Sequence, residues 1–224
     1  MPILLTELNL DETLRYMGCP PDQADPATLA LVRSCGEELL AAIRPRWTHR
    51  VLDLTFEAEG LRLGPLLLPG ESLKQHLAGC CRGVLFCATL GVEADNLIRR
   101  SQVTDVARAF ALDACAAAAV EQVCDAIEEE LKNQFPGCFF PSRFSPGYGD
   151  LPLDVQSALL SLLDAPRKVG LTATASHILL PRKSVTAILG VADQPLEKRL
   201  RSCSDCPARD SCVYRKTGGH CGIS

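Results

Sequence analysis

The sequence predicts an α+β fold in which a mixed or antiparallel sheet packs against long helices. Helix-patterned and strand-patterned segments do not alternate regularly, which argues against a doubly wound parallel sheet. A long helical pattern runs from about 94 to 134, and two β-rich runs follow at 171–179 and 184–192. The chain ends in a cysteine-rich stretch, so we expect one domain at 1–195 and a small tail at 196–224.

The composition is that of a folded protein. Of the 224 residues, 47% are hydrophobic and 22% are charged, which provides enough apolar side chain for a substantial core. The formal net charge of -4 gives no overall case for a nucleic-acid partner. No apolar run reaches membrane-spanning length, and the N-terminus lacks the pattern of a signal peptide. These features predict a cytoplasmic protein that binds neither membrane nor nucleic acid.

The N-terminal segments predict two helices. Residues 10–18, LDETLRYMG, are typical of a short helix that ends at Gly18. Residues 25–46 predict a longer helix that Pro45 ends. In that helix Asp25 is the expected N-cap and Pro26 occupies the first helical position.

Short strands and a short helix are expected next. Polar and apolar residues alternate at 47–56, which predicts a strand. Residues 61–70 are ambiguous, and Pro65 restricts them to an edge strand or a connection. Residues 71–79 predict a short helix, and the apolar run at 83–91 predicts a buried strand.

The long helical pattern at 94–134 is expected to break near Ser101. The small side chains at 114–120 predict close packing against a neighbouring element. At about 100° per residue, Glu121 faces roughly away from Leu112, and on this pattern alone it is a solvated carboxylate. One apolar stripe repeats every three or four residues: Leu112, Ala116, Ala119, Val123, Ile127 and Leu131.

The stretch RFSPGYGD, residues 143–150, is too rich in glycine and proline for a helix or an interior strand. Its Pro-Gly pair predicts a turn, and Gly147 and Gly149 permit positive φ and close backbone approach. Exposed amides in such a loop can bind an anionic or polar ligand. Arg143 offers a planar fork for a carboxylate, and Tyr148 offers a flat face and a hydroxyl. Taken alone, this pattern is more typical of a turn that leads into a helix.

A helix is expected directly after this loop, at 153–163. The two β-rich runs at 171–179 and 184–192 are expected to form a β-hairpin through a turn at 181–183. Phosphate-binding, dinucleotide-binding, hydrolase and zinc-protease motifs do not occur in the sequence. We therefore expect no catalytic residue, and the isolated histidines are expected to be satisfied or exposed side chains: His49, His76, His177 and His220.

The run from Arg143 to Tyr148 resembles the Arg-x-x-Pro-Gly-Tyr element in the activation domain of cobalamin-dependent methionine synthase. Further stretches resemble the small stand-alone members of that family, in the same order along the chain. They are TLRYMG, LAGCCRGVLFCATLG, the alanine-rich helix with AVEQVCD, and LLPRKSVTAILGV. The resemblance extends from about Leu10 to about Ala192 and implies the fold of that activation domain.

In that family the loop binds S-adenosylmethionine (SAM). The resemblance implies that Arg143, Tyr148 and Glu121 contact SAM and that Ser145 makes backbone contacts. After the tyrosine the family sequence continues Pro-x-x-Pro-Asp-His, whereas this chain continues from Gly149 with GDLPL. The resemblance therefore implies no side-chain contacts beyond the tyrosine. With the backbone of the loop included, the predicted binding residues are Glu121, Arg143, Ser145, Pro146, Gly147, Tyr148 and Gly149.

In the full-length enzyme this domain covers an oxidised cobalamin, a reductase delivers an electron, and SAM supplies the methyl group. The present chain lacks the Asp-x-His-x-x-Gly signature of a corrinoid-binding domain. The resemblance therefore implies an activation protein that acts in trans on a corrinoid-dependent methyltransferase such as methionine synthase. A partner would supply the cobalamin, and an electron-donor protein is a second expected partner.

The 12 cysteines fall into two groups. Those before residue 139 are scattered through apolar patterns, and most are expected to be buried, reduced thiols. The last four have the spacing Cys-x2-Cys-x5-Cys-x8-Cys, for which an iron–sulfur cluster ranks first, zinc second and unmetallated thiols third. A disulfide is disfavoured in a cytoplasmic protein. The resemblance does not extend to these four predicted metal ligands, which are Cys203, Cys206, Cys212 and Cys221.

Two other functions compete with the activation protein. One is a non-catalytic module that carries a structural zinc tail and docks on a corrinoid protein. The other is a SAM-dependent methyltransferase acting on a small molecule, which is disfavoured because no residue near the loop stands out as a general base.

Overall fold

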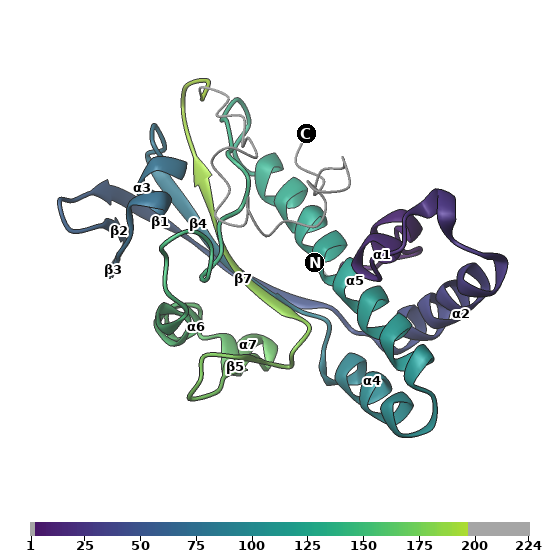
Figure 1. The fold of residues 1–224 in the computed structure, drawn as a ribbon. Helices are drawn as coiled ribbons and strands as arrows, with labels where there is room; N and C mark the ends of the chain where they lie inside the picture. Colours follow the sequence, from purple (N-terminus) through teal and green to yellow (C-terminus); the bar gives the residue numbers. More distant parts are fainter. Residues whose placement is uncertain (1–2, 197–224) are drawn as a thin grey trace.

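A five-stranded antiparallel sheet forms the centre of the molecule, with strand order β3-β2-β1-β4-β7. The computed structural model describes residues 3–196, so the four predicted metal-binding cysteines lie outside the described residues. The long strands are β1 (Arg46–Phe56), β4 (Arg82–Thr89) and β7 (Ser184–Val191). Helices pack on both faces of the sheet (Figure 1), which confirms the predicted α+β class.

The helices divide into two layers. α1 (Leu10–Tyr16), α2 (Pro26–Ala42), α4 (Val92–Thr104) and α5 (Val106–Asn133) belong to one hydrophobic core. α3 (Glu71–His76), α6 (Gln156–Leu163) and α7 (Ala165–Val169) belong to the other. The described part of the chain also contains two short 3₁₀ turns, η1 (Pro21–Gln23) and η2 (Leu153–Val155).

Strand β4 separates the two cores. Phe86 and Ala88 point into the first core, while Leu85 and Cys87 point into the second. The alternation follows from the pleat of a strand, and it explains why this apolar run contains no polar face. The predicted buried strand is confirmed.

Local signals placed the first two helices correctly. The Asp25 carboxylate accepts the N–H of Thr28 at 2.9 Å, which confirms it as the N-cap of α2, and Pro26 is the first helical residue. α1 ends just before Gly18, which takes the positive φ of 69° expected of a helix stop.

The ambiguous segment at 61–70 forms a small hairpin of β2 (Leu61–Leu63) and β3 (Leu66–Leu68). It lies at the edge of the sheet, where β2 pairs with β1. Both alternatives are present: the segment forms strands at the edge of the sheet, and Pro65 lies in the connection between them, outside the ladder.

The break in the long helical segment occurs at Asp105, not near Ser101 as predicted. Asp105 has an extended backbone, with φ at -155°, and its carboxylate accepts the N–H of Arg108 at 3.0 Å. Asp105 is therefore both the C-cap of α4 and the N-cap of α5. The side chain of an aspartate competes for backbone donors in this way, whereas Ser101 stays buried inside α4.

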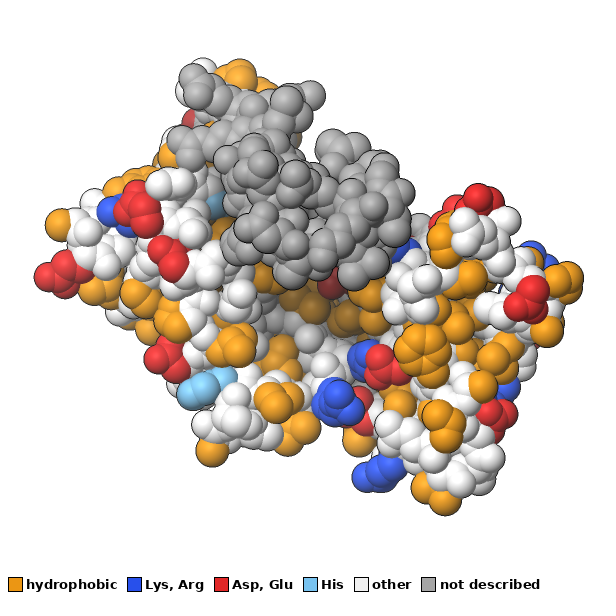
Figure 2. Space-filling model, viewed as in Figure 1, with side chains coloured by type: hydrophobic (Ala, Val, Ile, Leu, Met, Phe, Trp, Pro, Cys, Tyr) orange, Lys and Arg blue, Asp and Glu red, His pale blue; other side chains and the backbone are white. Residues whose placement is uncertain are grey.

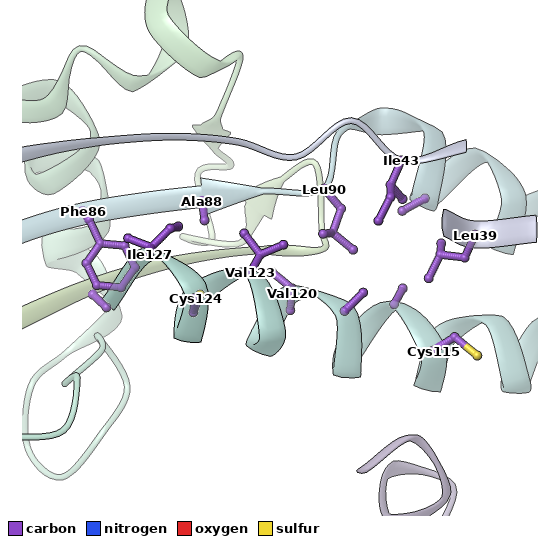
Figure 3. Packing of buried hydrophobic residues seen from close by; sticks show 14 of the residues in the cluster. Leu39, Ile43, Phe86, Ala88, Leu90, Cys115, Val120, Val123, Cys124 and Ile127 are labelled. Atoms are coloured by element: carbon purple, nitrogen blue, oxygen red, sulfur yellow. The ribbon is translucent and has the colours of Figure 1, made fainter. Parts of the chain in front are cut away.

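Helix α5 extends along the first core from α2 to β4. Figure 3 shows its Cys115 near Leu39 of α2 and its Ile127 near Phe86 of β4. All six residues of the predicted apolar stripe are fully buried. Most of the small side chains at 114–120 are buried, and α5 packs against both α2 and α4, so the prediction of a close neighbour is confirmed.

The predicted hairpin of 171–179 with 184–192 is wrong. The first run folds on itself as β5 (Thr172–Ala173) and β6 (Leu179–Leu180), closed by the N–H of Thr174 on the carbonyl of Ile178 at 2.8 Å. The second run becomes β7 and pairs with β4 in the central sheet. Since most of β7 is buried on both faces, it needs a place between two helix layers, which a surface hairpin cannot give.

The outer edge of β7 is covered by the chain that follows α5. Phe139 pairs with Ala192, and Phe144 pairs with Ile188, both in antiparallel bridges. This covering removes the exposed backbone groups of an edge strand. It also fixes the start of the loop at 143–150.

Most of the scattered cysteines behave as predicted. Cys35, Cys80, Cys87, Cys115 and Cys124 are buried, and only Cys81 is exposed among those described. Burial raises the pKa of Cys87 and Cys115 to about 12, which marks them as packing residues and not as reactive thiols. Among the described helices, none is long and apolar enough to cross a membrane.

The close packing of α5 gives the first prediction. Ala116→Leu should lower the free energy of unfolding by about 1–3 kcal/mol, because the larger side chain has no space at this fully buried position. Ala107→Leu is the matched control on an exposed face of the same helix and should change stability by less than about 0.5 kcal/mol. Urea unfolding followed by circular dichroism measures both. Equal midpoints for the two variants would contradict the packing argument.

Candidate functional site

The loop at 143–150 begins on the edge of β7. The N–H of Phe144 donates to the carbonyl of Ile188 at 2.9 Å, and the N–H of Ile188 donates to the carbonyl of Phe144 at 2.8 Å. Adjacent residues of an extended chain point to opposite faces. Phe144 is therefore buried in the second core, and Arg143 points to the opposite face, toward α5.

Arg143 lies against three carboxylates of α5. Its Nη1 donates to Asp125 at 2.7 Å and also to Glu128, and its Nη2 donates to Glu121. The three acidic residues follow the spacing i, i+4, i+7, which places them on one side of a helix. We call these four residues the Arg143 cluster.

Because Arg143 and Glu128 are largely buried, the charged side chains of the Arg143 cluster depend on one another for stability. The side chains of Arg143 and Glu128 are 20% and 12% exposed, so each needs the other to offset lost hydration. Burial lowers the pKa of Arg143, but hydrogen bonds from its fork to Glu128, Glu121 and Asp125 outweigh this and raise the pKa above its ordinary value. One permanently charged guanidinium thus faces three carboxylates, and the cluster carries an excess of negative charge.

The cluster extends what the sequence predicted. Arg143 and Glu121, both predicted binding residues, are brought into contact. Glu121 is partly shielded and ion-paired, so the solvated carboxylate expected from the helix pattern alone is wrong. Asp125 and Glu128 were not singled out, although their spacing from Glu121 was a visible signal.

The turn itself uses its amides internally. The N–H of Gly147 donates to the carbonyl of Leu151 at 2.8 Å, and the N–H of Tyr148 donates to the carbonyl of Ser145 at 3.1 Å. Pro146 is buried. The amides of Gly147 and Tyr148 therefore form hydrogen bonds within the turn. A ligand that approached the turn would contact the side chains of the loop before these two amides.

Tyr148 is the exposed aromatic side chain of the loop, with 49% of its surface accessible. Its ring meets that of Phe144 edge to face, with centroids 5.9 Å apart. Tyr148 therefore has a half-exposed ring supported by Phe144, which is suited to contact with a flat ligand.

The end of the loop is fixed to α3. The Asp150 carboxylate accepts the N–H groups of Glu71 at 2.7 Å and Ser72 at 3.0 Å. These hydrogen bonds, that of Glu71 first, hold the pKa of Asp150 below its ordinary value. Gly149 has a φ of 54°, and a side chain there would come within 2.5 Å of Ser72. The Gly149-Asp150 pair, where the sequence departs from the motif that the loop resembles, thus has a structural role.

The other end of α3 also contacts this loop region. His76 Nε2 lies 2.6 Å from the carbonyl of Ser142, and its ring lies 5.1 Å from that of Phe144. Neither His76 nor α3 was connected with the loop at the level of sequence, because the contacts join residues far apart in the chain.

A separate pocket of about 260 Å³ lies between α4, α5 and the turn before β7, and it contains none of the predicted binding residues. Its charged groups are partly paired, with Lys183 Nζ 3.0 Å from Asp113 and the N–H of Arg182 on Asp95 at 2.8 Å. Figure 2 shows the surface hollowed between the part that holds α6 and the part that holds α4, with side chains of both charges on the α4 side.

Within residues 3–196, no group of three or more His, Cys, Asp or Glu side chains is placed to hold a metal ion. The predicted metal ligands of the tail lie outside that range, so the cluster and zinc predictions stay predictions.

Comparison with known proteins supports the fold. No protein-family model matches this sequence, and no curated protein matches it. Among solved structures, the chain is similar to the MetH reactivation domain in its crystal structure bound to AdoHcy, with a TM-score of 0.61 and 13% sequence identity. The similarity covers 95% of this chain and 82% of that one. At this identity the comparison shows a shared fold, the one that the resemblance in the sequence implied.

Proposed function

We propose that this chain is a SAM-binding activation protein that supports the reductive remethylation of a corrinoid-dependent methyltransferase, acting in trans. The observation that carries the proposal is an Arg-x-x-Pro-Gly-Tyr loop lying against the acidic side of α5 in the fold of the MetH reactivation domain. That domain was crystallised with AdoHcy, which is SAM without its transferable methyl group. The sequence motif and the fold are separate lines of support.

The charges of the site match those of SAM. SAM carries a sulfonium and an ammonium, and both would be attracted by the excess of carboxylates in the Arg143 cluster. A guanidinium has five N–H donors, of which Arg143 uses three in its contacts with α5. The remaining donors suit the carboxylate of SAM, and the half-exposed ring of Tyr148 suits the adenine ring.

The proposed division of labour follows from what the chain contains. SAM supplies the methyl group, a partner protein supplies the corrinoid that accepts it, and an electron-donor protein supplies the electron. The chain's own residues bind SAM, orient it by its charged end and support its ring. We propose that residues 1–195 form this SAM-binding domain and that 196–224 add a cysteine-rich metal or iron–sulfur tail.

One observation favours the alternative of a non-catalytic docking module. Arg143 is already paired with three carboxylates of its own chain, as a purely structural arginine would be. In that case the tail cysteines would hold zinc, and the protein would shield or sense a corrinoid protein without binding SAM.

Calorimetric titration with SAM separates these two functions, provided that folding effects are removed. Arg143→Ala alone should cost about 2–3 kcal/mol of stability, because it leaves the buried Glu128 carboxylate without its partner. We therefore place Arg143→Ala in a Glu128→Gln background, which carries no such charge. Glu128→Gln should still bind SAM, and the double variant should bind at least about tenfold more weakly.

Urea unfolding of the same variants serves as the control, since the double variant should regain most of the stability lost by Arg143→Ala. Absence of saturable SAM binding by the native protein would refute the proposed function. Equal SAM affinity of the double variant and its Glu128→Gln parent would refute the role of Arg143.

The excess negative charge gives a further prediction. SAM should bind more tightly than AdoHcy, which lacks the sulfonium charge, and added salt should reduce the difference. Asp125→Asn should lower the ratio of the affinity for SAM to the affinity for AdoHcy by about threefold. Glu129→Gln is the matched control, because Glu129 lies on the same helix and pairs with Lys132 instead. A ratio that is unchanged in Asp125→Asn would contradict the electrostatic argument.

The tail is tested by metal analysis of anaerobically purified protein. A brown protein that contains iron and sulfide, and that loses its colour in Cys206→Ser, supports the iron–sulfur proposal. A colourless protein with one zinc per chain supports the zinc alternative, and a protein with neither metal contradicts both.

A further inference from the structure

Helix α3 begins without an N-cap side chain of its own. The residue at that position is Gly70, which offers no oxygen to the first N–H groups of the helix. Asp150, which lies 79 residues beyond Glu71 in the chain, supplies both of its carboxylate oxygens instead. One oxygen accepts the N–H of Glu71 and the other accepts the N–H of Ser72, where the helix dipole also favours a negative charge.

The contact is also tightly packed. A Cβ at Gly149 would lie 2.5 Å from both Cβ and Oγ of Ser72, and a Cβ at Gly70 would lie 2.6 Å from an oxygen of Asp150. The backbone of the loop therefore lies directly on the first turn of α3. Leu73 and Leu77 are fully buried in the second core, so α3 forms a fixed support.

The loop is thereby held at both ends. At the start of the loop the backbone of Phe144 is hydrogen-bonded to β7. Just after Asp150 the side chain of Leu151, which is 1% exposed, anchors the chain in the core. Between these points the turn is closed by its own hydrogen bonds at Gly147 and Tyr148. Of the described contacts along 145–150, those of Gly149 and Asp150 with α3 tie the turn to a separate element.

We propose that Asp150 is a positioning residue that sets the conformation of the 143–150 loop by fixing it to the N-terminus of α3. The identity of the ligand in this inference rests on the proposed function, whereas the effect on the loop does not. Asp150 would not touch SAM. It would act by keeping the turn, and with it Tyr148, in the arrangement that the ligand meets.

The variants test this role against a general loss of stability. Asp150→Ala removes both hydrogen bonds, and Asp150→Asn keeps one acceptor oxygen. Asp25→Ala is the matched control, because it removes a carboxylate cap of the same kind from α2, away from the loop. Hydrogen–deuterium exchange measures the amides of Gly147, Tyr148 and Leu151, and calorimetry measures the affinity for SAM.

We expect Asp150→Ala to accelerate exchange of these loop amides and to weaken SAM binding, each by about tenfold. Asp150→Asn should have an intermediate effect. Asp25→Ala should lower the melting temperature by a similar amount, yet leave loop exchange and SAM affinity within about twofold of the native protein. Unchanged loop exchange in Asp150→Ala, or equal weakening of SAM binding by Asp25→Ala, would overturn the inference.

A second set of variants keeps the inference testable if Asp150→Ala does not fold. Gly149→Ala should loosen the loop for two reasons: the new Cβ meets Ser72, and alanine is strained at a φ of 54°. Ser72→Gly added to it removes the atoms that clash and should restore the part of the protection that the clash abolished. No restoration in the double variant would contradict the coupling. If the native protein binds no SAM, the proposed function fails, and loop exchange alone decides the role of Asp150.

Discussion

Antiparallel pairing of the chain after α5 with the outer edge of β7 is the constraint on which the candidate site depends. Two bridges, at Phe139 and Phe144, lay this segment along the sheet. The pleat then sends neighbouring side chains to opposite faces, so Phe144 fills the core beside α3 while Arg143 reaches the carboxylates of α5. One register decides both contacts, since a shift by one residue would bury the arginine and expose the phenylalanine.

The same register creates an electrostatic dependence between loop and helix. Glu128 is buried, and a buried carboxylate persists in charged form only if its partners offset the lost hydration. Arg143 provides that partner, yet Glu121 and Asp125 also contact it, so the pairing does not neutralise the site. The arginine is therefore both part of the fold and part of the charge pattern that a ligand meets, and its two roles cannot be separated by removing it alone.

How far the sequence predicts this structure depends on the range of each interaction. α2 was predicted correctly because its signals are local: Asp25 caps the amide of Thr28, three residues away. The helix break was misplaced by four residues because the apolar pattern continues past Ser101, and the decisive feature was the cap at Asp105. The predicted hairpin failed because short β-rich runs do not specify their partners, which here are set by burial between helix layers.

The candidate site shows the same division. The acidic spacing on α5 was visible in the sequence, and so was the turn at Pro146-Gly147. The hydrogen bonds of Asp150 to α3 join residues 79 positions apart, and no local pattern could reveal them. At 13% identity, the similarity to the MetH reactivation domain shows a shared fold, whereas the side chains of the site are this chain's own. In this chain the residues that follow Tyr148 include Asp150, and its carboxylate fixes the end of the loop to α3.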